Sequence, residues 1–128
     1  MRNSVMKAAK VHKPFRYMGG HPDYPEPTKG LQKHQSRLCV TDDGVTLVIP
    51  GVSIFKSEKI LLHIPREHIR EVRHINESTA LDLRNYVDAD VELGGNVYTA
   101  RFQAFGGDQM EDVLRLTMEI KRLTFPRN

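Results

Sequence analysis

The chain has 128 residues and a mass of 14.7 kDa, a length at which a single domain is the default. Its 39% hydrophobic content excludes a disordered chain, and no apolar run approaches the roughly 18 residues of a membrane span. The net charge of +3 is uneven, because residues 1–16 hold five basic and no acidic residues, whereas residues 17–128 hold the other 14 basic and all 16 acidic residues. The sequence therefore predicts a basic, mobile tail over 1–14 and one mildly acidic domain over 15–128.

The compartment is indicated by two features. Cys39 is the single cysteine, so no internal disulfide can form, and residues 1–13 lack the apolar core of a secretory signal. Both features favour a cytoplasmic location. If the protein binds lipid, we expect it to lie peripherally at the inner face of the membrane.

Strands account for most of the predicted structure. Residues 15–18 form a short apolar run that ends at Gly19 and Gly20, and a loop rich in proline follows. Apolar residues then alternate over 38–40 and 45–49, on either side of a turn at 42–44, which predicts a hairpin with one apolar face. After a brief apolar segment at 52–55, residues 60–64 predict a fourth strand.

The segment 65–75 is compatible with two structures. Ile69, Val72 and Ile75 recur every three residues and Pro65 suits a first helical position, which would be typical of a helix. We favour a tight turn at 65–68 leading into a strand from Ile69, because the surrounding strands form a meander. Residues 87–93 and 98–104 then alternate around a turn at 94–96 and predict a second hairpin.

The C-terminal segment changes to a helical period from Asp108. One broad face is apolar, with Asp108 as the expected N-cap, Glu111 as its partner in a capping box, and Pro126 beyond the last turn. The residues of that face are Met110, Val113, Leu114, Thr117, Ile120 and Leu123. The fold class is thus mainly β with one C-terminal α-helix.

The order of these elements resembles the pleckstrin homology and GRAM superfamily, especially its small bacterial members. The resemblance spans about residues 15–124 and is carried by four segments. These are Tyr17 to Pro22 at the end of the first strand, Leu38 to Val45 as a hairpin, Ile64 and Pro65 before His68 and Ile69, and Phe102 to Phe105 running into the helix. It implies a pleckstrin-homology-like bent antiparallel barrel of about seven strands, capped by a helix over 108–123.

The same resemblance implies where an anionic lipid would bind. Members that bind phosphoinositides carry basic residues in the loop between the first two strands and on the second strand. The positions here, joined by the lysines around the next turn, form a candidate basic mouth: Lys29, Lys33, His34, Arg37, Lys56 and Lys59. Gln35 interrupts the basic pattern of that family, and Asp23 and Glu26 in the same loop would repel phosphate.

Other chemistry has less support in the sequence. His63, His68 and His74, with Glu67 and Glu71, are the one cluster of metal-ligand types, but without ligand spacing, so no metal or other cofactor is expected. Cys39 lies in mid-strand with no neighbouring base, so no catalytic residue is expected. There is no phosphate-binding glycine motif, and glutamates interrupt Arg66, Arg70 and Arg73, which disfavours nucleic acid.

The sequence therefore favours a non-enzymatic binding module. Protein-protein interaction or self-association, through a sheet edge or the groove beside the helix, is the preferred function. Peripheral binding to an anionic membrane surface through the basic mouth is the alternative.

Overall fold

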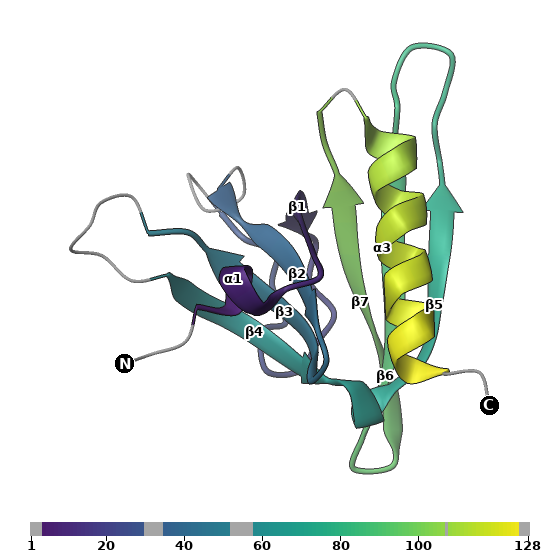
Figure 1. Cartoon of the computed structure of the whole chain (residues 1–128). Coiled ribbons are helices and arrows are strands. Elements are labelled where there is room, and N and C mark those ends of the chain that lie inside the picture. Colours follow the sequence, from purple (N-terminus) through teal and green to yellow (C-terminus); the bar gives the residue numbers. More distant parts are fainter. Residues whose placement is uncertain (1–3, 30–34, 52–57, 107, 126–128) are drawn as a thin grey trace.

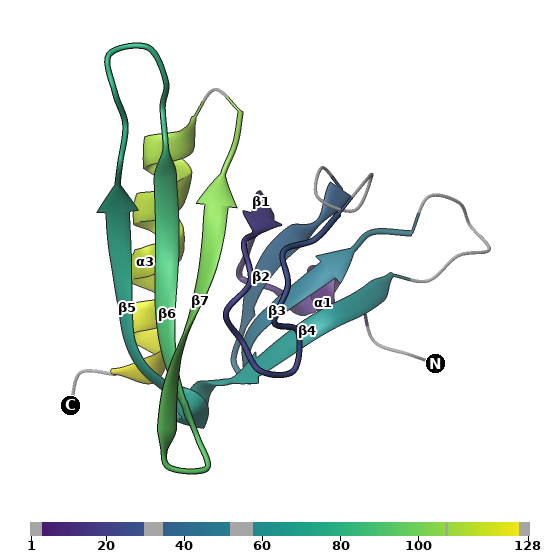
Figure 2. The ribbon, with the colours of Figure 1, turned by 180° about the vertical axis from the view of Figure 1, so that it is seen from behind.

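The computed structural model describes residues 4–29, 35–51, 58–106 and 108–125. Its seven strands form one open antiparallel sheet in the order β4-β3-β2-β1-β7-β6-β5, and helix α3 lies against the half that contains β5, β6 and β7 (Figures 1 and 2). The elements, in chain order, are α1 (Val5–Ala8), β1 (Val11–Tyr17), β2 (Arg37–Thr41), β3 (Gly44–Ile49), β4 (Lys59–Pro65), the 3-10 helix η1 (Arg66–His68), β5 (Ile69–Asn76), β6 (Asn85–Leu93), β7 (Asn96–Ala104) and α3 (Gln109–Thr124). The predictions of a mainly β chain, about seven strands and a C-terminal helix are confirmed.

Strand β1 bends the sheet into its two halves. Val11 to Pro14 pair with β2, whereas Phe15 to Tyr17 pair with β7. Pro14, which has no N–H to donate, lies where the strand changes partners, and Ser36 Oγ donates to the carbonyl of Phe15 at 2.7 Å just beyond. Both halves therefore curve around one core.

The start of β1 differs from the prediction of a tail over 1–14. The strand begins at Val11, and Lys13 occupies an inward position, opposite Leu38. An inward charge breaks the apolar alternation that marks a strand, but here Lys13 Nζ lies 3.5 Å from a carboxylate oxygen of the nearly buried Asp112 on α3. The partner of Lys13 is about a hundred residues away, so the local pattern could not reveal it.

Helix α1 covers the outer surface of β2 and β3. The carboxylate of Glu58 accepts hydrogen bonds from the hydroxyl of Ser4 at 3.2 Å and from the backbone N–H groups of Val5 and Met6 at the start of this helix. The outward-facing Cys39, Thr46 and Val48 are consequently buried as fully as the inward residues of the same strands. The N-terminal segment is thus packed from Ser4 onward, which corrects the expectation of a mobile tail for these residues.

The connection from β4 to β5 is a turn followed by a strand. Residues 66–68 form the 3-10 turn η1, and β5 runs directly from Ile69. The turn-plus-strand interpretation of 65–75 is confirmed, and the helical alternative is wrong. The interval of three between Ile69 and Val72 arises because a register shift between Ile69 and Glu71 inserts an extra residue, so that both face inward.

The apolar face of α3 is divided in the structure. Val113, Leu116 and Ile120 are fully buried against the sheet, whereas Met110, Leu114 and Met118 are about half exposed. The prediction of one continuous buried face is therefore wrong for Met110 and Leu114. A helix that rests on one sheet buries only the arc that faces it, and apolar residues outside that arc stay in solvent.

The N-terminus of α3 yields the first testable prediction. Asp108 is the N-cap residue as predicted, but its ψ of 39° lies outside the extended region that capping residues adopt, and its side chain makes no capping hydrogen bond to a described residue. We therefore expect Asp108→Ala to lower the free energy of unfolding by less than about 1 kcal/mol, the residual attraction between a carboxylate and a helix N-terminus. Urea denaturation measures this change in the free energy of unfolding. A loss of about 2 kcal/mol would instead show that the Asp108 side chain caps the helix.

A compact loop after β1 is built on a buried tyrosine and a buried histidine. The Tyr17 hydroxyl donates to the carbonyl of Tyr24 and accepts from the His21 N–H at 3.0 Å, and the Tyr24 ring meets Tyr17 edge-on at 5.5 Å between centroids. His21 is 1% exposed, and its Nδ1 accepts from the Asp23 N–H at 3.0 Å. Burial is the main cause that lowers the pKa of His21 from its usual 6.5, with a smaller effect of His68 in the same direction.

This lowered pKa predicts a pH dependence. The folded state prefers neutral His21, so the contribution to stability is complete above about pH 6.5 and is lost as the pH falls from there toward the folded-state pKa. The free energy of unfolding should therefore decrease as the pH falls below about 6.5. In His21→Asn, whose amide oxygen can replace Nδ1 as acceptor, this part of the decrease should disappear. The exposed His12→Asn serves as the control, and an identical pH profile in the two variants would contradict the prediction.

Candidate interaction surface

The predicted basic mouth is described only in part. Lys33, His34 and Lys56 lie outside the described residues. Arg37 begins β2 and Lys59 begins β4, on either side of the end of β3, where Val48 pairs with Arg37 and Ile49 with Lys59. Lys29 is exposed in the loop between β1 and β2. The structure therefore brings Arg37 and Lys59 to the same end of the sheet.

Two lysines of the N-terminal segment already have acidic partners. Lys10 lies 3.1 Å from a carboxylate oxygen of Asp42, and Lys13 pairs with Asp112. The Glu58 carboxylate, next to Lys59, adds negative charge beside the mouth. The basic charge available to an anionic surface is thus smaller than the sequence suggests.

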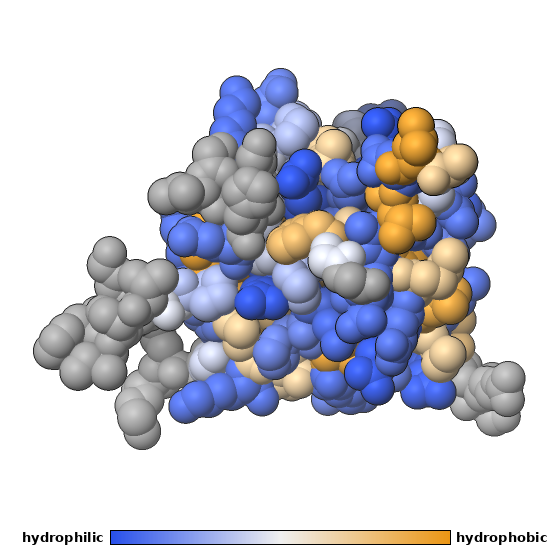
Figure 3. All heavy atoms as spheres, turned by 90° about the horizontal axis from the view of Figure 1, so that it is seen from above, coloured by the Kyte–Doolittle hydropathy of each residue, from blue (hydrophilic) through white to orange (hydrophobic). Residues whose placement is uncertain are grey.

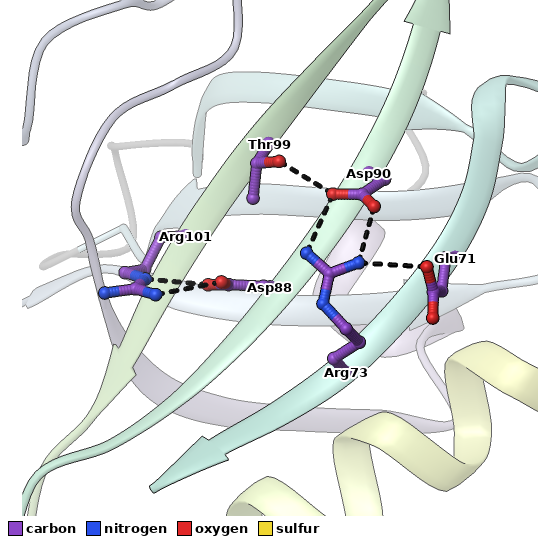
Figure 4. A network of polar contacts seen from close by, with 6 residues as sticks. All are labelled: Glu71, Arg73, Asp88, Asp90, Thr99 and Arg101. Atoms are coloured by element: carbon purple, nitrogen blue, oxygen red, sulfur yellow. Dashed lines mark hydrogen bonds and ion pairs between the residues drawn. The ribbon is translucent and has the colours of Figure 1, made fainter. Parts of the chain in front are cut away.

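The strongest group of charges lies on the outer surface of β5, β6 and β7, where each charge faces a partner (Figure 4). Arg73 donates to Asp90 and to Glu71, each at 3.0 Å, and Asp90 also accepts from the Thr99 hydroxyl at 2.7 Å. The hydrogen bonds from Arg73 are the main cause that lowers the pKa of Asp90. Because its hydrogen-bonding groups are engaged with one another, this network stabilises the sheet and offers little to a ligand.

A second pair extends the same network. Arg101 donates to both carboxylate oxygens of Asp88, at 2.8 and 3.0 Å, and its guanidinium lies 4.6 Å from the centroid of the Tyr86 ring. The hydrogen bonds to Asp88 are the main cause that raises the pKa of Arg101. The arrangement is that of a bidentate structural pair.

The nucleophile and metal-ligand candidates of the sequence lie apart. Burial raises the pKa of the Cys39 thiol to about 12, with a further contribution from Glu58, so the nucleophilic thiolate is suppressed. His63 Nδ1 lies 2.7 Å from the Thr46 hydroxyl, and His74 Nε2 lies 3.1 Å from the Asn85 amide oxygen. Within the described ranges, no three side chains of histidine, cysteine, aspartate or glutamate are grouped as a metal ion would require.

Two pockets lie away from the exposed side of α3. One is lined by a single loop, and the other is lined mainly by polar and charged residues. A pocket of about 430 Å³ lies within the proline-rich loop, between Tyr24 and Lys29. Another, of about 410 Å³, lies between the β2–β3 turn, η1 and the end of α3, where Lys10 and Arg122 already pair with Asp42 and Glu119. The charges of the second pocket are therefore largely balanced.

The exposed side of α3 carries a row of apolar residues. Met110, Leu114 and Met118 follow one another at intervals of four residues and are 43%, 50% and 50% exposed. They line a shallow groove of about 690 Å³, bordered by Glu111, Arg115, Glu119 and Arg122. We call these three apolar residues the α3 stripe. Three half-exposed apolar residues in one row are unusual for a surface without a partner.

Two residues of the α3 stripe, Met110 and Leu114, face the β5 edge of the sheet. Asp112 points toward β1, because it pairs with Lys13, and Met110 and Leu114 lie about 160° to 200° around the helix from it at 100° per residue. In the strand order, β5 is the edge strand on the side away from β1, and α3 contacts β5 more than any other strand. Met110 and Leu114 therefore lie beside the outer edge of β5, whereas Met118, about 240° around the helix from Asp112, points away from the sheet.

The loop between β5 and β6 adds to this side of the molecule. Leu81 is 98% exposed and Leu83 is 60% exposed. The base of the loop meets the start of α3, where Asn85 Nδ2 donates to the Gln109 side chain at 3.5 Å. Figure 3 shows hydrophobic residues gathered on the side where α3 and this loop lie in Figure 1, with hydrophilic residues over much of the rest of that view.

Comparison with protein-family models, with curated proteins and with solved structures finds no match for the chain. In the described part of the chain, no helix has both the length and the apolar character needed to cross a membrane. Function must therefore be inferred from the surface itself.

Of the α3 stripe, the sequence places Met110 and Leu114 on the apolar face that is expected to be buried, and it does not single out Met118. The signal that could have separated them is the width of the apolar arc. Its members spread over more of the helix circumference than one sheet can cover, and Met118 lies beyond the predicted arc altogether.

Proposed function

We propose that this protein is a non-enzymatic interaction module that binds an extended polypeptide segment at the β5 edge. The observation that carries the proposal is that the half-exposed Met110 and Leu114 of the α3 stripe lie beside the edge strand β5. An edge strand offers backbone N–H and C=O groups in a row, and an adjacent apolar groove gives side chains a place to bury.

The geometry defines the chemistry of the segment. A strand added to β5 presents alternate side chains to the α3 side of the sheet, so apolar residues at every second position would contact Met110 and Leu114. Completing the burial of these half-exposed side chains contributes roughly 1 kcal/mol each. The backbone hydrogen bonds add specificity for an extended conformation.

The fold supports the same class of function. We propose that the chain has the pleckstrin-homology-like architecture that its sequence resembles, and the strand order, the bend at β1 and the helix on the second half of the sheet support it. That architecture hosts both protein and lipid ligands, so the site, and not the fold, decides between them. The single, buried Cys39 agrees with a cytoplasmic location.

Selection of displayed random peptides on the immobilised protein tests the proposal. We expect the selected peptides to share apolar residues at alternate positions and to bind wild type in a fluorescence anisotropy titration. Leu114→Glu should weaken that binding at least about tenfold, because it places a charge in the apolar groove. The matched control is Val97→Glu, which changes a valine that is 61% exposed on β7. Equal binding by both variants would overturn the proposal.

Anionic lipid is the competing ligand, and Arg37 and Lys59 at one end of the sheet favour it. Cosedimentation with vesicles of phosphatidylserine and phosphatidylcholine, compared with phosphatidylcholine alone, measures it directly. Lipid binding would require the anionic vesicles, weaken as salt shortens the Debye length from about 10 Å to about 3 Å, and fall in the double variant Arg37→Ala with Lys59→Ala. Such a result, with no selected peptides, would replace the protein-interaction proposal.

A further inference from the structure

The segment 4–9, which contains α1, lies across the outer side of β2 and β3 (Figure 1). We infer that residues 4–9 form a releasable strap that is held closed by Glu58, and that the strap opens without unfolding of the domain and thereby exposes Cys39. The strap lies on the half of the sheet away from β5, so its behaviour is independent of the proposed interaction surface.

The strap has little stability of its own. Helix α1 has four residues, and none of them is buried. Isolated helices shorter than about 12 residues are marginal in water, because the first turn fixes several backbone angles in return for one hydrogen bond. The strap is therefore held in place by its contacts with the rest of the chain.

Glu58 provides the polar contacts that hold the strap. Its carboxylate accepts hydrogen bonds from the Ser4 hydroxyl at 3.2 Å, from the Met6 N–H at 3.3 Å and from the Val5 N–H. The Ser4 oxygen also caps the helix, because it accepts from the Lys7 N–H at 3.2 Å. Hydrogen bonds to a carboxylate are roughly twice as strong as neutral ones, so one side chain anchors the whole first turn.

The strap ends where the chain joins the sheet. Ala9 is extended, with φ −71° and ψ 135°, and the next residue, Lys10, donates its N–H to the carbonyl of Val40 at 2.8 Å. Pairing between β1 and β2 begins at Val11. Rotation about the backbone of Ala9 can therefore lift the strap while the strand pairing stays intact.

Cys39 reports whether the strap is closed. Its side chain lies on the outer side of β2 and is fully buried. Burial is the largest cause that raises the pKa of this thiol, and Glu58 is the second. Opening of the strap removes the burial, so the thiol reacts in the open form and is protected in the closed form. The alkylation rate is then the rate of an exposed thiol multiplied by the fraction of open molecules.

Alkylation of the native protein by N-ethylmaleimide, followed by mass spectrometry, tests the inference. We expect wild type to react slowly and completely, at a rate that changes little at low urea concentrations, because opening of the strap exposes little surface. Ser4→Ala should raise the rate about fivefold, because it removes the helix cap and one hydrogen bond to Glu58. Ser4→Asn keeps a capping oxygen and a donor, and it should react at nearly the wild-type rate.

Glu58→Gln should raise the rate at least about tenfold, because it places an amide N–H₂ among groups that are themselves donors. This change also removes a negative charge near Cys39, whereas Ser4→Ala leaves every charge in place, so Ser4→Ala decides whether the strap is the cause. Glu67→Gln is the matched control, because Glu67 is an exposed glutamate of η1, and its rate should equal that of wild type.

Gly95→Ala separates opening of the strap from unfolding of the domain. The strain at this positive φ weakens the whole domain, so a thiol that reacts only through global unfolding would react about fivefold to thirtyfold faster. We expect an unchanged rate. That acceleration in Gly95→Ala, wild-type rates in Ser4→Ala and Glu58→Gln, or a wild-type thiol that reacts as fast as in unfolded protein would each overturn the inference. Far-ultraviolet circular dichroism confirms that each variant is folded.

Discussion

Replacing Phe102 with alanine is expected to lower the free energy of unfolding by about 3 to 5 kcal/mol. Phe102 is 1% exposed on the inward side of β7, and its ring lies 5.4 Å from that of Tyr17 on β1. It pairs across the strands with Val87 on one side and Tyr17 on the other. Its removal leaves a cavity where the two halves of the sheet meet, and the surrounding strands cannot collapse into it without losing their register.

Urea denaturation of wild type and Phe102→Ala measures this loss. Phe125→Ala provides the matched control, because Phe125 follows the last turn of α3 and is 52% exposed. The control should change the free energy of unfolding by less than about 1 kcal/mol. If Phe102→Ala costs no more than the control, the inward assignment of Phe102 is wrong.

Replacing Gly20 with alanine is expected to cost about 3 kcal/mol or more. Gly20 has a φ of +108°, a conformation that side chains disfavour, and an added Cβ would lie 1.8 Å from the carbonyl oxygen of Thr99. That oxygen belongs to the backbone of β7 and cannot move aside alone. The loop would have to leave β7, breaking the hydrogen bonds from Met18 N–H to the Arg101 carbonyl at 2.8 Å and from Arg101 N–H to the Gly19 carbonyl at 3.1 Å.

Gly95→Ala separates backbone strain from steric clash. Gly95 also has a positive φ, +83°, but a Cβ there would meet no atom within 4 Å. The control should therefore cost about 1 to 2 kcal/mol, the strain alone. The difference between the two variants, measured by urea denaturation, reports the close approach of the loop to β7. Equal costs would mean that the loop is free to move away from the strand.

Local periodicity determined most of the fold. The β2–β3 and β6–β7 hairpins follow from alternation around turn residues, and α3 follows from the change of period after Gly106. These elements depend on neighbours within a few residues in the sequence. For 65–75 the local period was compatible with a helix, and the meander of the surrounding strands favoured the turn and strand that the structure has.

Tertiary contacts decided what local patterns could not. Lys13 belongs to β1 only because Asp112 faces it, and Cys39 is buried on both sides only because α1 covers the outside of its strand. In the first case a charge inside the sheet is paired with an opposite charge that is far away in sequence. In the second case the outer side of a strand is covered by a helix that is far away in sequence. Alternation reports which residues share a side of a strand, but it carries no information about what covers that side.

The candidate site shows the same division. By itself the sequence determined that Met110, Leu114, Val113 and Ile120 lie within one apolar arc of a helix. Only the tertiary structure decided that Val113 and Ile120 face the sheet, that Met110 and Leu114 remain in solvent, and that β5 is the edge beside them. The physical reason is that burial depends on where distant strands place the sheet beneath the helix, whereas a hydrophobic period depends only on residues within a few turns.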